Sequence, residues 1–290
     1  MARRISAAQY RAQLRRAQSD LNRAVNRYNA GVRKVNRAID DYNREARQHN
    51  ARVRANRQRL QRELARLRST SSSSSSTQSR TYRVSMQSFQ TSYQRLVDSG
   101  AEARLPPDWI DLSEGEAANS VAAMNAISDA EGDGDDASAN RLTDTTIDGE
   151  LAQVDEDLDR RWRGALFALD PRNPDAARHF CTSARELLGR LLESAAPDDL
   201  VVTADPDCPR TDQGSITRRA RIEYCLAERG HPDEHFADFV EEDIRNVLEL
   251  FRVFNDGTHG SAGRLGVAQL RAVKTRVEDA IKFIHRVAFA

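Results

Sequence analysis

Near the end of the chain, the stretch FRVFNDGTHG (residues 251–260) places Arg252 seven residues before His259. Histidine can move a proton at neutral pH, and a guanidinium group binds phosphate oxygens with two parallel hydrogen bonds. Cleavage of RNA without a metal uses both abilities, because one group moves the 2′-hydroxyl proton and a cation stabilises the phosphorane charge. Arg252 and His259 are therefore candidate catalytic residues. One histidine cannot serve as both base and acid, so a dimer could supply the second.

The same stretch also has the pattern of a helix end. Asn255, Asp256 and Gly257 favour turns, and a left-handed residue among them would end the helix. Arg252 would then lie in the last helical turn, where the helix macrodipole stabilises a cation. In this alternative Arg252 is a capping residue, His259 is an ordinary loop residue, and the stretch has no catalytic role.

The segments around this stretch must hold it in place, and their pattern is helical. From residue 148 onward, apolar residues recur at spacings of three and four, and Asn173 with Pro174 forms a helix-capping pair. The only candidate strand is the short LVVTA at residues 200–204. We predict an all-α bundle over residues 148–290. Its helices are expected at about 150–169, 174–196, 215–229, 234–254 and 264–287.

Residues 1–68 form a different kind of segment, with two heptad series typical of a coiled-coil seam. It carries 19 Lys or Arg against 5 Asp or Glu, a net charge of +14. His49 and Asn56 are polar seam positions, which commonly fix register or strand number. We predict a long helix that associates as a coiled coil; the alternative is that its cations contact RNA or DNA. The series are Leu14, Leu21, Tyr28, Val35, Tyr42 and Val25, Val32, Ile39, Ala46, Val53, Leu60, Leu67.

A linker and a spacer follow this segment. Residues 69–81 are rich in serine and predict a flexible linker. Residues 82–147 predict two short amphipathic helices, one over 82–97 and one preceded by a capping box of Ser113 and Glu116, and then an acidic stretch. That stretch, DAEGDGDDASAN, lacks the ligand spacing of an EF-hand, so we expect a solvated loop without calcium.

The composition excludes several classes of protein. No apolar run approaches the ~18 residues of a membrane span, and the Arg-rich start has no apolar signal-peptide region, so we expect a cytosolic protein. Three widely spaced cysteines predict reduced thiols rather than a disulfide framework. A zinc site of Cys208, Cys225, His231 and His235 does not match a known structural spacing, so no metal and no cofactor are expected. Other polar candidates have simpler explanations: Arg185 and Glu186 as a surface pair or as residues that orient Arg252, and His285 as a surface residue near a helix end.

The motif also resembles a known family. An arginine, four to six residues and a histidine in an all-helical C-terminal bundle resemble the HEPN superfamily, which implies a metal-independent ribonuclease whose domains dimerise to form a composite cleft. FNDGTHG, together with RHFCTSARELLGRLL at residues 178–192, also resembles predicted nuclease domains associated with prokaryotic PIWI proteins. The residue after the arginine in active HEPN motifs is often Asn, Asp or His, whereas here it is Val253. Asn255 or Asp256 would supply the missing polar contact, or the domain binds without cleaving.

These observations lead to one hypothesis and one alternative. The hypothesis is an endoribonuclease of bacterial anti-phage defence or of a toxin-like system, with Arg252, His259, Asn255 and Asp256 as its site residues and RNA as substrate. It implies a homo-oligomer formed through the coiled coil and the bundle, a partner protein of the defence system, and no membrane. The alternative is a non-catalytic coiled-coil scaffold or regulatory protein that binds a partner.

Overall fold

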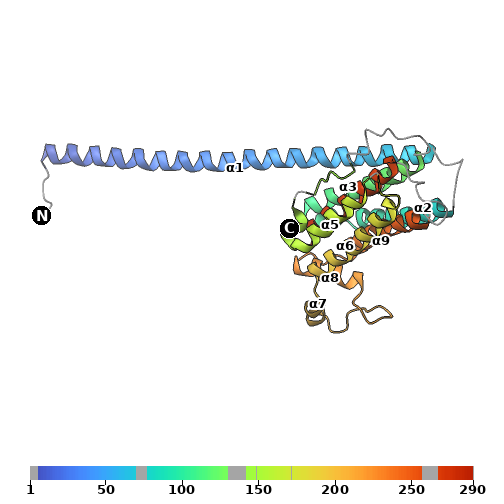
Figure 1. Cartoon of the computed structure of the whole chain (residues 1–290). Helices are drawn as coiled ribbons and strands as arrows, with labels where there is room; N and C mark the ends of the chain where they lie inside the picture. The colour runs from blue at the N-terminus through green and yellow to red at the C-terminus, as the bar shows by residue number, and fades with distance from the viewer. Residues whose placement is uncertain are drawn as a thin grey trace. The chain divides into compact units, whose positions relative to one another are not determined.

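A computed structural model describes residues 6–69, 77–129, 142–147, 149–170, 172–256 and 267–289 (Figure 1). Helices dominate this part of the chain, and it contains no strand, which confirms the all-α prediction. It divides into two compact units, residues 1–52 and residues 53–290. The helices are α1 (Ala7–Ser69), α2 (Thr77–Asp98), the short 3-10 helix η1 (Ala101–Ala103), α3 (Pro107–Asp129), α4 (Glu150–Val154), α5 (Glu156–Ala168), α6 (Ala176–Ala195), α7 (Asp198–Ala204), α8 (Arg218–Glu228), α9 (Glu234–Asp256) and α10 (Val267–Ala288).

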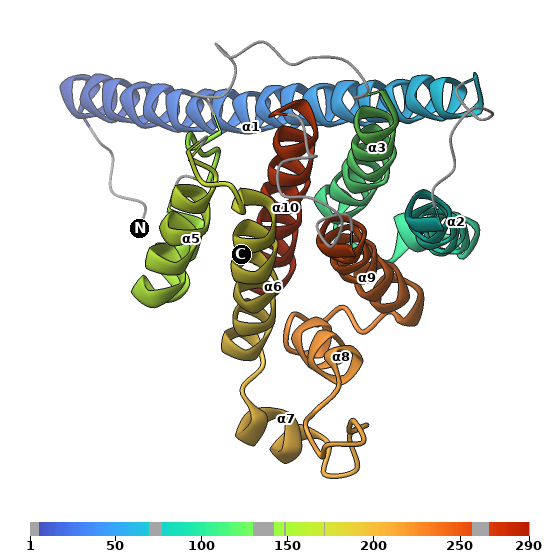
Figure 2. The ribbon, with the colours of Figure 1, turned by 45° about the vertical axis from the view of Figure 1, so that its right-hand side comes forward.

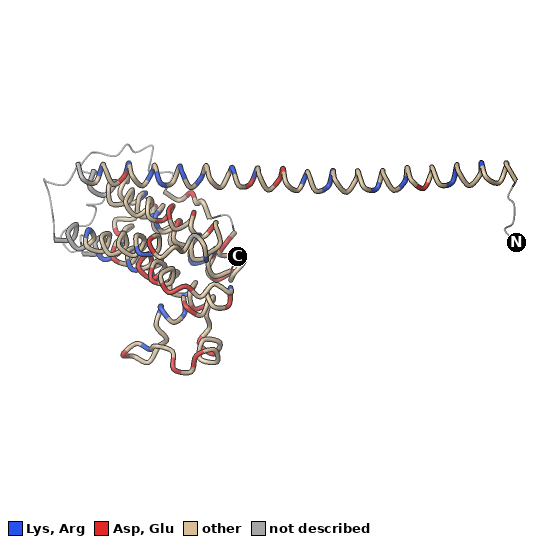
Figure 3. The backbone as a smooth tube through the Cα atoms, turned by 180° about the vertical axis from the view of Figure 1, so that it is seen from behind, with Lys and Arg blue, Asp and Glu red and all other residues tan. Residues whose placement is uncertain are grey.

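The first unit consists of the first part of α1. Helix formation there confirms the predicted long helix, and Lys and Arg residues occur along its length (Figure 3). The large apolar residues of both heptad series are exposed in this single chain, from 38% for Val32 to 73% for Tyr28. Association into a coiled coil therefore stays a prediction. The exposed residues are Tyr10, Leu14, Leu21, Val25, Tyr28, Val32, Val35, Ile39 and Tyr42.

The second unit has one main hydrophobic core, built around α9. This helix packs along α2, and α5 packs along α6 (Figure 2). Aromatic side chains connect α9 with α2 and α10. The centre of the Phe239 ring on α9 lies 5.1 Å from that of Phe89 on α2 and 5.8 Å from that of Phe283 on α10. Helices α2 and α3 from the predicted spacer region therefore share the core of the C-terminal helices.

The end of α1 also belongs to this second unit. Leu60, Leu64 and Leu67 pack against the core as partly buried residues. Asn56, one of the polar seam positions, donates from Nδ2 to Oδ1 of Asp111 on α3 at 2.9 Å. From residue 53 onward, the helix therefore has a partner within its own chain.

The predicted capping box was wrong. Ser113 does not cap a helix, because α3 begins at Pro107 and the Ser113 hydroxyl donates to the Trp109 carbonyl inside that helix at 2.9 Å. LVVTA, the only candidate strand, is part of the short helix α7 (Asp198–Ala204), in agreement with the all-α prediction. An apolar run of only a few residues fits a strand and a helix equally well, and tertiary packing decides between the two.

Polar side chains set the boundaries of the next helices. The expected helix over 150–169 is interrupted at Asp155, where the backbone is extended. Asp155 is the N-cap of α5, because its Oδ1 accepts a hydrogen bond from the Asp157 amide at 2.9 Å. Asn173 lies before α6 and accepts from the Asp175 amide at 3.1 Å, so it forms a turn ahead of the helix. The N-cap of α6 is Asp175 rather than Asn173.

The segment 142–147 is tied to α10 by a buried carboxylate. Glu278 accepts from the Thr145 hydroxyl at 2.8 Å and from the Thr146 amide at 3.2 Å, and it pairs with Lys274 at 3.2 Å. Thr145 Oγ1 also accepts from the indole of Trp162 at 3.0 Å. These bonds satisfy polar groups that would otherwise be costly to bury.

All three cysteines are free, as predicted, and all three are buried. Burial raises the pKa of Cys181 to about 12 and that of Cys225 to about 11. At pH 8 these two thiols are therefore protonated and unreactive. We expect them to react with Ellman's reagent at least roughly 100-fold more slowly in native protein than in guanidinium chloride. Fast labelling of Cys181 or Cys225, identified by mass spectrometry, would contradict this.

Among the described helices, none is both long and apolar enough to cross a membrane.

Candidate functional site

The predicted site lies at the end of α9. This helix continues to Asp256, two residues beyond the predicted end, so Arg252 lies just before its last turn. The Arg252 side chain is 72% exposed, and its Nη1 lies 3.3 Å from Oε2 of Glu249 one turn earlier. Asn255 and Asp256 are the last two helical residues, and His259 lies outside the described residues. The meeting of Arg252 with His259 therefore stays a prediction.

Packing of α9 fixes the position of Arg252. Leu250 and Phe251, which precede it directly, are fully buried in the main core. Since neighbouring residues on a helix point in different directions, burial of these two places Arg252 on the exposed side. The helix thus presents a guanidinium group to solvent from a rigid support. An exposed ion pair such as that with Glu249 contributes little energy, so Arg252 remains available to an anionic ligand.

A buried polar network crosses the same helix about two turns before Arg252. Arg276 on α10, with a fully buried side chain, donates to Glu116 Oε2 on α3 at 2.7 Å and to Asp243 on α9. Its Nε also donates to the Ser120 hydroxyl at 3.0 Å. This set, called here the Arg276 network, therefore joins α3, α9 and α10 through one guanidinium.

Helix α2 joins the Arg276 network through an amide. Oδ1 of Asn246 on α9 accepts from the hydroxyls of Tyr82 and Ser120, each at 3.2 Å, and its Nδ2 donates to Ser85 at 3.3 Å. This network is not predicted by any motif in the sequence. A signal was present, because Asp243 and Asn246 are polar residues on the apolar face of α9, between Val240 and Val247.

The Arg276 network holds two carboxyl groups against one guanidinium. Burial raises the pKa of Glu116 well above its usual range, although Arg276 opposes this; Asp243 raises it further. Burial likewise raises the pKa of Asp243, against the effect of Arg276. Burial lowers the pKa of Arg276, but Asp243 and Glu116 raise it more, so this guanidinium stays charged. One buried cation cannot balance two carboxylates, so the pair holds a proton in the folded protein to a higher pH than a free carboxyl group does.

A carboxyl group with a raised pKa in the folded state stabilises the fold at low pH, and this contribution is lost as pH rises. We therefore expect Glu116→Gln, which stays neutral, to gain stability relative to wild type as the pH rises above 4.5, the ordinary pKa of a glutamate side chain. The difference should grow by up to about 1.4 kcal/mol per pH unit. Urea unfolding of both proteins at several pH values measures it.

Asp157→Asn is the matched control for this experiment. Asp157 is exposed, and its hydrogen bond with Arg161 lowers the pKa of the carboxyl below its usual value. It stays ionised from pH 5 upward, so its replacement should change stability by an amount independent of pH in this range. If the free energy of unfolding changes with pH in the same way for wild type and Glu116→Gln, the pKa of Glu116 is not raised in the folded protein.

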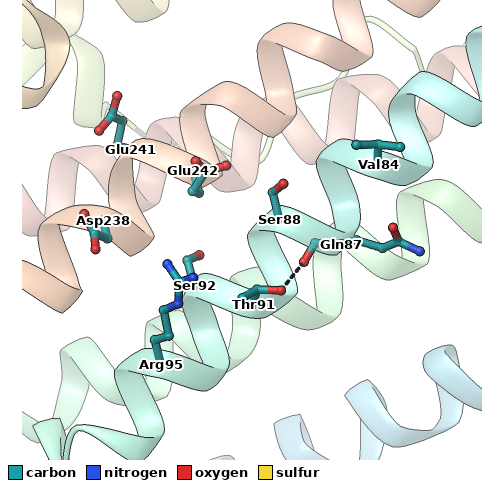
Figure 4. Close-up of a pocket in the computed structure, with 9 residues that line it drawn as sticks. All are labelled: Val84, Gln87, Ser88, Thr91, Ser92, Arg95, Asp238, Glu241 and Glu242. Carbon is teal, nitrogen blue, oxygen red and sulfur yellow. Dashed lines mark hydrogen bonds between the residues drawn. The ribbon is translucent and has the colours of Figure 1, made fainter.

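A polar pocket of about 390 Å³ lies between α2 and α9 (Figure 4). Its α9 wall carries Asp238, Glu241 and Glu242, whose charges would repel a phosphate group. Their nearby cations, Arg219 and Arg245, already pair with these carboxylates. This pocket therefore does not suit nucleic acid. The lining residues are Val84, Gln87, Ser88, Thr91, Ser92, Arg95, Asp238, Glu241 and Glu242.

A second pocket, of about 280 Å³, lies between α3, α10 and the end of α1. Arg59 and Arg271 line it together with a single carboxyl group, Asp279, and Nη1 of Arg59 donates to Asn119 at 2.6 Å. Its lining includes Ala268 in the first turn of α10, the helix that follows the FRVFNDGTHG stretch. Its arginines suit an anion better than the acidic pocket does.

The other candidate residues from the sequence are not among those that line this second pocket. Arg185 and Glu186 are exposed on α6. The His285 ring stacks on Phe289 at 5.6 Å, and burial lowers its pKa. In the described part of the chain, no three His, Cys, Asp or Glu residues are grouped to hold a metal ion, so the zinc alternative has no ligand set there.

Comparison with known proteins points to nuclease chemistry. No curated protein and no solved structure matches the chain. Residues 151–284 match the family described as "Predicted pPIWI-associating nuclease". The match covers somewhat less than half of the chain and runs from α4 into α10, so it includes Arg252. It names this family rather than the HEPN superfamily, whose assignment stays a prediction. The C-terminal part of the chain is a nuclease-like domain similar to that family.

Proposed function

We propose that this protein is an endoribonuclease that cleaves RNA without a metal ion, in the cytosol, as part of a pPIWI-linked defence system. The observation that carries the proposal is the match to a pPIWI-associating nuclease over residues 151–284. A second observation supports it: within this range, α9 presents Arg252 to solvent beside a fixed core. Defence against phage is the role that a pPIWI-associated nuclease suggests.

In this proposal each residue has one chemical task. His259 moves the 2′-hydroxyl proton, and Arg252 binds the scissile phosphate and stabilises the charge that develops on it. Asn255 or Asp256 provides the polar contact that Val253 cannot make. Two copies of the chain form one cleft, so that the second histidine protonates the leaving oxygen. The arginine-lined pocket beside α10 is a place for a neighbouring phosphate of the substrate.

Incubation of the purified chain with total RNA in EDTA tests the proposal. We expect cleavage by wild type to persist in EDTA and to disappear in His259→Ala. Cleavage that EDTA abolishes would contradict the metal-free mechanism. Equal cleavage by both proteins would contradict the role of His259 or indicate a contaminating nuclease. A dilution series of wild type adds a test of the two-copy cleft, because specific activity should fall as dimers dissociate.

The second candidate function is a scaffold that binds a partner without cleaving RNA. The ion pair of Arg252 with Glu249 favours it, because such pairs three residues apart are ordinary features of a helix surface. The two functions differ in their cellular effect. Growth inhibition on expression that Arg252→Ala relieves would support the nuclease, whereas an unchanged effect would support the scaffold.

A further inference from the structure

We propose that residues 10–46 form a parallel, two-stranded coiled coil with a second copy of the same chain. The inference goes beyond the proposed nuclease function, because these residues lie in the first unit, outside the matched range. It starts from the exposed apolar stripe of α1. This stripe spans five heptads, more than the three or four that indicate a coiled coil.

The same apolar stripe continues beyond residue 53, and its contacts there show that it packs against other helices. Leu60 and Leu67 occupy the same heptad position as Val32 and Ile39, and in the second unit they pack against helices of their own chain. From residue 10 to residue 45, by contrast, every residue of α1 is exposed in the described chain. An exposed apolar stripe on a long helix is unfavourable in water, so residues 10–46 require a helix from another molecule.

Charge placement identifies that helix as a second copy. With Val25, Val32 and Ile39 at position a of the heptad, every Lys and Arg from Ala17 to Arg44 falls at the outer positions b, c and f. The outer ion pairs Arg23–Asp20 and Arg44–Asp41 also lie there, at 2.5 and 2.7 Å. The strong positive charge of the helix therefore faces away from the seam.

Between Ala17 and Arg44 the positions that flank the seam carry no charge; in the rest of residues 10–46, Arg15 lies at e, Glu45 at g and Arg11 at a. Positions e and g normally choose between partners by interhelical salt bridges. A partner of different sequence would therefore find few charges to recognise beside the seam, whereas an identical helix needs none. The e residues are Asn22, Asn29, Asn36 and Asn43, and the g residues are Ala17, Ala24, Gly31 and Ala38.

The seam residues also select the number of strands and their direction. In a parallel coiled coil, β-branched residues at position a together with Leu at position d favour two strands. Val25, Val32 and Ile39 occupy three consecutive a positions, and Leu14 and Leu21 occupy d. Gln18 is a polar residue at position a, which fixes one register. A parallel pair brings both copies of residue 53, where the second unit begins, to the same end of the coil. Two nuclease-like domains are thereby held near each other.

Sedimentation equilibrium of the full chain tests the association. We expect twice the chain mass of 32.5 kDa for wild type. Leu21→Glu with Ile39→Glu places two charges in the seam and should raise the dissociation constant at least 100-fold. The matched control, Asn26→Glu with Gln48→Glu, adds the same charges at outer positions and should change it less than threefold. A monomeric wild type, a trimer or tetramer, or an equal effect of both variants would overturn the proposal.

Cysteine cross-linking of the full chain tests the direction. Leu14→Cys alone should form an intermolecular disulfide on oxidation, because identical positions face each other only in a parallel pair. A mixture of Leu14→Cys and Tyr42→Cys chains should give no disulfide between unlike chains; finding one would overturn the parallel arrangement. Wild type, with its three buried thiols, is the control. Neither experiment measures cleavage, so failure here is distinct from failure of the nuclease proposal.

Discussion

Arg252→Ala is expected to slow RNA cleavage about 10²–10³-fold, the effect of removing one group that stabilises charge in a transition state. His259→Ala is expected to slow it about 10²–10⁴-fold, the range for general acid or base catalysis. Both losses should appear mainly in kcat, because the charge on the phosphorane and the proton transfer arise during the reaction. Single-turnover cleavage of a defined RNA, followed on a denaturing gel, measures both.

The matched control for Arg252 is Arg245 on the same helix. Arg245 is also exposed, at 52%, and also pairs with carboxylates one turn earlier, Glu241 and Glu242. Arg245→Ala should therefore leave the cleavage rate unchanged. If Arg245→Ala and Arg252→Ala slow cleavage equally, the charge of α9 attracts RNA in general and Arg252 is not a catalytic residue. If neither variant slows it, Arg252 is a structural surface residue.

The second large effect is expected at Arg276. Arg276→Met is expected to lower the free energy of unfolding by about 3–5 kcal/mol, because removal of one partner leaves buried carboxyl groups without a cation. Glu116 and Asp243 are buried and cannot turn toward water. Ser120 and Asn246 would also lose the geometry that the guanidinium imposes. Urea unfolding followed by circular dichroism measures the change.

Two further variants make this test specific. Arg163 is 76% exposed and pairs with Asp159 on the surface, so Arg163→Met should cause no measurable change. Adding Glu116→Gln to Arg276→Met removes one of the stranded carboxyl groups and should recover part of the loss, since the two sites are in direct contact. A loss no larger than that of Arg163→Met would mean that water reaches the Arg276 network and replaces the guanidinium.

The Arg276 network also connects parts of the chain that the sequence presents as separate. Tyr82 and Glu116 come from α2 and α3, whereas Asp243 and Arg276 come from within the matched nuclease-like region. We infer that the region 151–284 is completed by α2 and α3. The sequence showed two short amphipathic helices there, but amphipathicity does not specify the helix that covers an apolar face.

Much of this protein follows from the sequence alone. The all-α class, the long helix α1 and the helices α6, α8, α9 and α10 are set by apolar residues at spacings of three and four, a local property that a linear pattern records. The number and wide spacing of the cysteines also predict free thiols, which the structure contains. Arg252 and His259 were selected by their chemistry, and the structure adds the exposed position of Arg252 on α9.

Only the tertiary structure decided the remaining features. Ser113 and Glu116 have the spacing of a capping box, yet both lie inside α3, where Ser113 bonds back to Trp109 and Glu116 reaches Arg276. Glu116 lies 160 positions from Arg276, and no local pattern encodes a pairing over that distance. The same holds for Asn56, a seam residue in the heptad series that binds Asp111 of its own chain. Local periodicity fixes which residues form a helix and which face is apolar, whereas the partner of that face depends on contacts between residues far apart in the sequence.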